Sequence, residues 1–460
     1  MSNYKNLTKY KSASFMELAT ISFPLMISAL SGNVMMFIDR LILARYSADA
    51  MTAVAASGMA CAIFMFGVVS TVSIAEVFVG QYNGAGKNEK VAEPVWQMIF
   101  FSLALVIVFW PLALFGAELF IPAGLEELGI PYFKILMFFA VLNPIWASLG
   151  AFFAGIGNPK IITFAAITGN IVNFFLDILL VFGYGDYIPA MGTSGAAIAT
   201  VVSLFIQAFI LAVVFLNKEN AKKYATRTAK FVKSTMLDCL KVGYPNSVGH
   251  MLEMLAWLVM FMLAGIASPN HVIALALGQT ILILFCFMSD GLQKGVIAVS
   301  SNLIGAGLQD KIKVMLFSAF KLHGVIVLLT AIPILFYPGL LIAAFNIDPS
   351  NAGSHLSLFH QVELTLACCW LYIIFDGLVW IFAGVLTSGG DTKFVMVANA
   401  VSVWLFGILP VYLLVNYTTT EPYYIWAITV VYAIFNMLWF MLRFRQGKWR
   451  KLNLSEQTSS

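Results

Sequence analysis

The feature that most constrains this chain is a series of twelve long apolar stretches. Each is about 20 or more mostly apolar residues long, the length that an α-helix needs to cross the hydrocarbon core of a bilayer. The stretches fall near residues 15–38, 50–79, 95–121, 132–154, 161–183, 195–216, 240–267, 272–304, 314–345, 361–387, 394–416 and 423–442. We therefore predict an all-α polytopic membrane protein with twelve transmembrane helices.

The composition agrees with this prediction and excludes several other classes of protein. Of the 460 residues, 61% are hydrophobic and only 10% are charged, whereas soluble domains carry about 25% charged residues. So few charges cannot cover the surface of a soluble protein of this length, and a disordered chain needs the opposite composition. A cytosolic enzyme, a nucleic-acid binder and a secreted disulfide-linked scaffold are excluded. The five cysteines form no CxxC motif, and we expect no cofactor.

The distribution of lysine and arginine predicts the orientation in the membrane. If both termini are cytoplasmic, the cytoplasmic segments hold 20 of the 26 basic residues, and the opposite side holds only Arg40, Arg45 and Lys134. This asymmetry is what the positive-inside rule requires. We expect a multi-pass protein of the cytoplasmic (inner) membrane. Its first span should be a permanent helix, because no small-residue cleavage site follows it.

An internal repeat divides the twelve spans into two sets of six. A shift of 221 positions aligns Glu17 with Asp238, Pro24 with Pro245, Gly84 and Gly86 with Gly305 and Gly307, and Lys90 with Lys311. Because six is an even number, both copies have the same orientation in the membrane. We therefore expect two six-helix lobes related by a pseudo-two-fold axis along the membrane normal, with a substrate path between them.

These observations predict the boundaries of the domains. The first lobe should comprise 1–216, the cytoplasmic linker 217–235, the second lobe 236–445 and a cytoplasmic tail 446–460. Pro24 and Pro245 are candidate hinges, because proline bends transmembrane helices.

Acidic residues inside the spans are costly, and each needs a partner or a function. Asp376 lies in the middle of a span, with Tyr372 and Trp380 four residues to either side and therefore on the same helical face. A carboxylate beside aromatic rings suits an organic cation, and it can also bind and release protons. The alternative is a polar contact buried between helices.

A second polar stripe follows Pro245. Asn246, His250, Glu253 and Trp257 have 4, 3, 4 spacing and share one face of an otherwise apolar helix. We expect this face to line a substrate cavity, with Glu253 as an ion-coupling or proton-coupling residue. For His250 alone, a hydrogen-bonded contact between helices is the favoured alternative.

A third set of polar residues lies in the first half. Asn173 and Asp177 are four residues apart, and such an oxygen-only pair can bind a hard monovalent cation or hold a proton. Asp39 adjoins Arg40 and could instead cap a helix or pair with that arginine. Asp290 and Lys294, also four apart, are interpreted as a structural ion pair, and Glu76 is left without a role.

The order of several segments resembles the multidrug and toxic compound extrusion (MATE) family, in its bacterial type with a Glu/Asp pair in the second lobe. The resemblance rests on "FIDRLILARYSADAMTAVA" (37–55), "GQYNGAGK" (80–87), "GIGNPK" (155–160), "GNIVNFFLDILLVFG" with "MGTSGAAIAT" (169–200), "VGYPNSVGHMLEML" (242–255) and "LYIIFDGLVWIFAGVLTSGGDTK" (371–393). It implies a second-lobe cation site at Glu253, Tyr372 and Asp376. It also implies a first-lobe cation site, a candidate Na⁺ site, whose members would be Asp39, Asn173, Asp177 and Thr200.

We expect a secondary active antiporter that exports organic, often cationic, compounds in exchange for H⁺ or Na⁺ by alternating access. No GxxxxGK[ST] motif is present, so an ion gradient must supply the energy. The alternative is a flippase for lipids or lipid-linked sugars, but such a protein needs basic residues within its spans, where acids prevail here. A membrane enzyme would need a clustered catalytic set, and none is evident. The expected partners are small organic molecules and the lipid bilayer, with no nucleic acid, and the protein should be a monomer.

Overall fold

A computed structural model describes residues 6–121, 123–339, 341, 358–418 and 420–451 of the chain. In these residues nearly all regular structure is helical, apart from an isolated antiparallel bridge between Tyr184 and Ile188. The parts of the predicted organisation outside the described residues are 1–5 and 122 of the first lobe, 340, 342–357 and 419 of the second lobe, and 452–460 of the tail. Residues 340 and 342–345 of this set belong to the predicted ninth span.

The first half of the chain forms helices as far as Tyr224. These are α1 (Phe15–Tyr46), α2 (Ala48–Val72), α3 (Ala75–Gly84), η1 (Asn88–Lys90), α4 (Glu93–Ala104), α5 (Val106–Pro111), η2 (Leu112–Gly116), α6 (Ala117–Phe120), α7 (Glu126–Phe138), α8 (Leu142–Gly155), α9 (Lys160–Phe182), α10 (Gly192–Phe215) and α11 (Lys218–Tyr224).

The second half repeats this pattern. Its described helices are α12 (Lys233–Ala267), α13 (Pro269–Gly305), η3 (Gln309–Lys311), α14 (Ile312–Ala331), η4 (Ile332–Phe336), α16 (Leu358–Ser388), α17 (Thr392–Val401), η5 (Ser402–Ile408), α18 (Leu409–Tyr417), α19 (Tyr423–Gln446) and η6 (Lys448–Lys451).

The number of spans agrees with the sequence-based prediction. Within the described residues, 11 helices are long and apolar enough to cross a membrane, and the number rises to 12 when one bent pair is counted as a span. That pair is α7 and α8, with an angle of 44° between them, at the position of the predicted fourth span 132–154. The all-helical membrane fold is confirmed.

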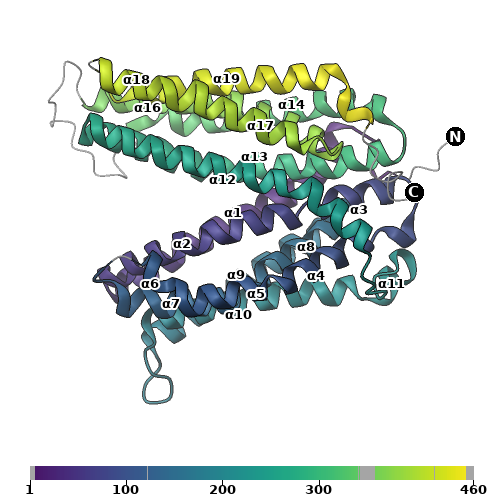
Figure 1. Cartoon of the computed structure of the whole chain (residues 1–460), viewed down its shortest axis with the longest axis horizontal. Coiled ribbons are helices and arrows are strands. Elements are labelled where there is room, and N and C mark those ends of the chain that lie inside the picture. Colours follow the sequence, from purple (N-terminus) through teal and green to yellow (C-terminus); the bar gives the residue numbers. More distant parts are fainter. Residues whose placement is uncertain (1–5, 122, 340, 342–357, 419, 452–460) are drawn as a thin grey trace.

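The helices gather into two bundles, and Figure 1 shows how they are arranged. α1 to α10 form the first bundle and α12 to α19 the second. The bundles approach each other at the end of the molecule where both chain termini lie, and they diverge toward the opposite end (Figure 1). Both α1 and α12 continue as helices through their internal prolines, Pro24 and Pro245.

The ends of the helices follow from local sequence. Ser47 separates α1 from α2, and its hydroxyl caps α2 by accepting a hydrogen bond from the Ala50 amide at 3.0 Å. Gly86 and Gly307 follow the ends of α3 and α13, each with φ of +71°, a conformation that favours glycine. The two GAG sequences therefore act as tight turns between helices at equivalent places in the two halves.

The two bundles meet through reciprocal contacts between α3 and α13. A Cβ on Gly84 would overlap the backbone carbonyl of Asn302, and a Cβ on Gly305 would overlap that of Gln81. The two contacts are related by the same shift of 221 positions that aligns the two halves of the sequence. Glycine is required at both positions because the helix backbones touch there.

Two hydrogen bonds extend this reciprocal arrangement. The amide of Gln81 donates to the carbonyl of Ser388 in the second bundle at 2.7 Å, and the amide of Asn302 donates to the carbonyl of Gly155 in the first bundle, also at 2.7 Å. Gly155 and Ser388 open the matching sequences "GIGNPK" and "SGGDTK". The internal repeat therefore forms the contact that holds the bundles together near the termini.

The connection between the halves is fixed to the first bundle by hydrogen bonds. The indole of Trp96 donates to the carbonyl of Thr226 at 2.9 Å, and the amide of Gln97 donates to the carbonyl of Lys230 at 2.9 Å. The Gln97 oxygen accepts from the amide of Val232 at 3.0 Å. Residues 226–232 are therefore held against α4.

A buried ion pair stabilises the second bundle near the same end. Arg443 donates to both carboxylate oxygens of Asp391, at 2.6 and 2.9 Å, and the Asp391 side chain is only 8% exposed. We expect Arg443→Met to lower the free energy of unfolding by about 3 kcal/mol, because it leaves a buried carboxylate unpaired. Thermal unfolding of the purified protein in detergent would measure this loss.

The exposed pair between Arg450 and Asp310 provides the control. Its atoms are 3.6 Å apart and Asp310 is 98% exposed, so Arg450→Met should leave the stability almost unchanged. An equal loss in the two variants would contradict the structural role of the buried pair.

Candidate functional site

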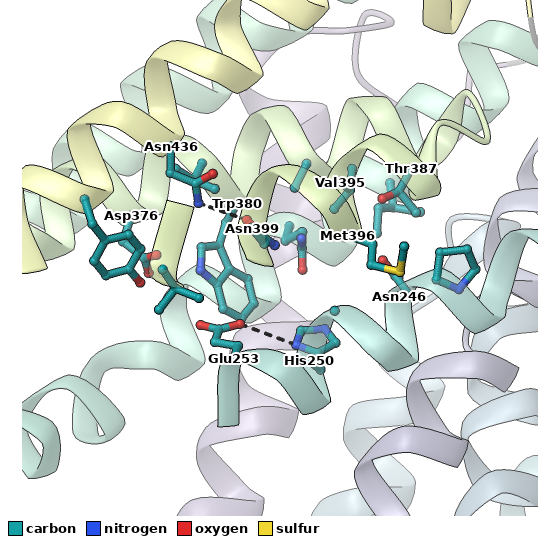
Figure 2. Close-up of a pocket in the computed structure, with 18 residues that line it drawn as sticks. Asn246, His250, Glu253, Asp376, Trp380, Thr387, Val395, Met396, Asn399 and Asn436 are labelled. Atoms are coloured by element: carbon teal, nitrogen blue, oxygen red, sulfur yellow. Dashed lines mark hydrogen bonds and ion pairs between the residues drawn. The ribbon is translucent and has the colours of Figure 1, made fainter. Parts of the chain in front are cut away.

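A polar cavity lies inside the second bundle, and Figure 2 shows the side chains around it. Its walls come from α12, α13, α16, α17, η5 and α19. The lining residues are Pro245, Asn246, Gly249, His250, Glu253, Gln293, Ile297, Asp376, Val379, Trp380, Ala383, Thr387, Val395, Met396, Asn399, Val403, Tyr432 and Asn436. The cavity volume is about 70 Å³.

Two carboxylates from different helices reach this cavity. Glu253 comes from α12 and Asp376 from α16, and the indole of Trp380 lies beside them (Figure 2). His250 lies one turn before Glu253, with 3.8 Å between its Nδ1 atom and the glutamate Oε2 atom. The arrangement brings two acids from distant parts of the sequence to a single site.

Tyrosine hydroxyls hold Asp376 in place. The hydroxyl of Tyr372 donates to Asp376 Oδ1 at 3.2 Å, and it also shares a hydrogen bond of 2.7 Å with the hydroxyl of Tyr432 on α19. Both tyrosine rings are at least 96% buried. Because buried hydroxyls with two partners have little freedom, the carboxylate of Asp376 is held in a fixed orientation.

Two asparagines complete the polar wall. The amide of Asn436 donates to Asn399 Oδ1 at 2.9 Å, as Figure 2 shows. Its own Oδ1 atom is buried and accepts no hydrogen bond within the described residues. A buried carbonyl oxygen without a donor is a natural ligand for a bound cation or water. Neither asparagine was identified from the sequence, because a single amide in an apolar helix has no periodic partner to indicate its role.

One of the residues predicted to line the cavity lies elsewhere. Asn246, His250 and Trp380 are among the lining residues, but Trp257 is not. Its ring packs against Trp426, with 5.8 Å between the ring centres, at the edge of an apolar cluster. Asn246, His250 and Glu253 reach the cavity from one face of α12, but the spacing of the stripe could not indicate how far the cavity extends along that helix.

A second cluster of acids lies in the first bundle, where α1 meets α9. Asn173 and Asp177 are at most 1% exposed and Asp39 is half-buried. With its amide nitrogen turned toward both acids, Asn173 donates to Asp39 Oδ1 at 2.9 Å and to Asp177 Oδ2 at 3.3 Å. The other oxygen of Asp177 has no hydrogen-bond partner in the described residues.

The other predicted member of this cluster points back to its own helix. The hydroxyl of Thr200 donates to the carbonyl of Ala196 at 3.0 Å. The alternative pairing of Asp39 with Arg40 is not observed, since no ion pair joins these two described residues. Asp39 instead lies within hydrogen-bonding range of Asp177.

Helix α13 carries a pair of residues with opposite charges. The Nζ atom of Lys294 is 2.8 Å from Asp290 Oδ2, and the two side chains are 42% and 30% exposed. Glu76 on α3, in the opposite bundle, lies within electrostatic range of both residues.

Two helical bundles with buried acids in each define a transport protein, and comparison with known proteins supports this class. The profile of the MatE family matches residues 24–179 and 245–413, which is most of the chain. The chain belongs to this family, the MATE transporters, whose members are not enzymes.

Two bacterial relatives align over nearly their full lengths. The NorM protein of Thermotoga maritima, named a probable multidrug resistance protein, is 23% identical over 90% of this chain and 88% of its own length. The YoeA protein of Bacillus subtilis, with the same description, is 21% identical over 94% and 95%. A solved multidrug resistance MATE transporter in an outward-facing conformation has a TM-score of 0.83 and 18% identity, and covers 96% of this chain and 99% of its own. The last comparison confirms the fold.

Proposed function

We propose that this protein is a secondary active antiporter that exports organic, often cationic, compounds in exchange for H⁺ or Na⁺. The observation that carries the proposal is the pair Glu253 and Asp376 in one cavity, beside the ring of Trp380. The residues that line this cavity include no lysine or arginine. A cavity with two acids and an aromatic ring attracts cations.

The size of the cavity favours an ion as its occupant in this conformation. About 70 Å³ is enough space for a small ion with a few waters, whereas drug-sized ligands occupy pockets of several hundred Å³. We assign a coupling ion to this cavity, and the acids of the first bundle form a second candidate ion site. The exported compound would then bind between the bundles, or in the same cavity once it widens.

The orientation of the protein follows from the charge distribution. We propose that both termini are cytoplasmic and that the lobes 1–216 and 236–445 move as units about Pro24 and Pro245. With this orientation the end where the bundles meet is cytoplasmic, and the bundles in Figure 1 diverge toward the outer side of the membrane. Ion binding changes the charge at the buried acids and favours one of the two packings of the lobes.

Protons and Na⁺ would require different orientations of the Asn173 amide in the first bundle. With its amide nitrogen turned inward, Asn173 donates hydrogen bonds to Asp39 and Asp177 without an ion between them. Sodium needs oxygen ligands instead. It would require the amide to turn over, so that Asn173 presents its oxygen together with Asp39, Asp177 and Thr200.

Transport into inverted membrane vesicles tests the proposal. We expect vesicles with the wild-type protein to accumulate a fluorescent organic cation when their lumen is made more acidic, or richer in Na⁺, than the outside solution. Without either gradient they should not accumulate it. For each proton that is coupled to export, one unit of pH difference multiplies the accumulation ratio of the exported compound by about ten. Asp177→Asn should lower the accumulation driven by the effective ion, because it removes a buried ion-binding oxygen.

Exposed Glu118→Gln in the same bundle is the matched control and should behave like wild type. Gradient-driven transport that is unaffected by Asp39→Asn, Asp177→Asn, Glu253→Gln and Asp376→Asn at normal expression would refute the antiporter proposal.

A further inference from the structure

Glu76 is a buried acid that the two ion sites leave unexplained. It is 6% exposed, and its Oε1 atom has no hydrogen-bond partner among the described residues. A buried carboxylate oxygen without a donor is costly and calls for an explanation. Glu17, which is also fully buried, has an Oε1 atom without a partner as well, but its Oε2 atom accepts a hydrogen bond of 2.6 Å from the amide of Ala13.

Glu76 lies on the face of α3 that meets the second bundle. It lies one helical turn before Gly80, on the same face of α3. A Cβ added to Gly80 would lie 2.6 Å from the Cβ of Ser301 on α13, so this face of α3 packs against the second bundle. The contacts of Gly84 and Gly305 follow one turn later. Any motion that separates the bundles at this end must uncover Glu76.

The charged neighbours of Glu76 come from the opposite bundle. Lys294 and Asp290 on α13 both act on it electrostatically, and they form an ion pair with each other at 2.8 Å. Asp290 in turn acts on His250 of α12. With Lys294 and Asp290 already paired, a charge on Glu76 has no partner of its own in this conformation.

The other elements packed against α3 contribute few ionisable groups. Helix α8 has none, and α4 has only Glu93, which accepts a hydrogen bond from the hydroxyl of Thr235. The short helix η1 carries Glu89 and Lys90 beyond the C-terminal end of α3. Lys294 and Asp290 are therefore the charges that govern Glu76.

We propose that Glu76 is a proton-binding site between the bundles, separate from the acids inside each bundle. In the packing described here its carboxylic acid is closed off by α13. When α3 and α13 separate, the O–H bond breaks, the proton passes to water on the side that opens, and the carboxylate is left near Lys294. The ligand is a proton rather than a metal ion, because the Lys294 ammonium repels cations and the described residues form no group of three metal-ligating side chains here.

Infrared difference spectroscopy on the purified full-length protein in lipid tests the site without any drug. The difference between spectra recorded at low and at high pH should contain the carbonyl band of a protonated carboxylic acid. Glu76→Gln should remove this band. Glu17→Gln is the matched control and should keep that band. If Glu76→Gln does not fold, Glu76→Asp should shift the band. Spectra of either folded variant that match wild type would overturn the proposal.

Transport provides a second measurement, which rests on the antiporter function proposed above. If Glu76 carries one coupled proton, Glu76→Gln should lower the accumulation ratio about tenfold at a pH difference of about one unit. A purely structural glutamate would be replaced by the isosteric glutamine without this loss, and unchanged accumulation would overturn the coupling role. Absence of transport by the wild-type protein would instead refute the antiporter function, and the infrared result would still decide the proton site.

Discussion

Asp376→Asn is expected to lower the export of an organic cation about 100-fold. The substitution keeps the shape of the side chain and an oxygen that can accept the Tyr372 hydroxyl at 3.2 Å, but it removes the negative charge from a buried cavity. The substitution removes the negative member of the charge pair that Asp376 would form with a bound cation, and such a loss costs about 3 kcal/mol, which corresponds to about 100-fold in affinity. Initial efflux rates from cells loaded with a fluorescent cation would measure the effect, with surface expression determined in parallel.

Glu363→Gln is the matched control for this experiment. It is the same type of change on the same helix, but Glu363 is 38% exposed and lies 3.5 Å from His360, away from the cavity. This variant should export normally. Equal losses in Asp376→Asn and Glu363→Gln would show that α16 tolerates no neutralisation, and wild-type export by Asp376→Asn would exclude the carboxylate from transport.

Gly305→Ala is expected to open the end at which the bundles meet and to abolish most transport. Its new methyl group would overlap the backbone carbonyl of Gln81, which cannot move aside as a flexible side chain could. Overpacking of this kind costs about 1–3 kcal/mol, and 3 kcal/mol changes a two-state equilibrium by about 100-fold. Gly84→Ala should have the same effect, because it meets Asn302 in the equivalent way.

Spin labels at Glu89 and Asp310 would measure this opening. The two positions are exposed, equivalent in the repeat and located on η1 and η3. In a background without the native cysteines, the distance between the labels should increase in Gly305→Ala. Gly324→Ala is the control, since a Cβ there would meet no atom within 4 Å. A wild-type distance distribution and normal transport in Gly305→Ala would contradict the closing role of this contact.

Much of the architecture could be predicted from the sequence because the bilayer imposes a length on each apolar stretch. The twelve stretches matched the observed spans, and the GAG sequences of the repeat marked equivalent turns. The fourth span was predicted as a single stretch and is a helix pair with a 44° bend. Hydropathy could not reveal that bend, since both parts are apolar.

The candidate site was predictable only along individual helices. Spacing of three or four residues placed His250 with Glu253, and Tyr372 with Asp376 and Trp380, because such residues share a helical face. It could not show that these two faces meet in one cavity, nor that Asn399 and Asn436 complete its wall. It also left Glu76 without a role, because the contact of α3 with α13 joins residues more than 200 positions apart.

By itself, the sequence determined the membrane location, the twelve spans, the two-fold repeat and the acids that need explanation, because each of these depends on local composition and periodicity. Only the tertiary structure decided which acids lie together, which tryptophan lines the cavity and where the bundles touch. The reason is that side chains on different helices meet through packing, and the packing of apolar helices depends on shape at each contact, as the paired glycines of α3 and α13 show.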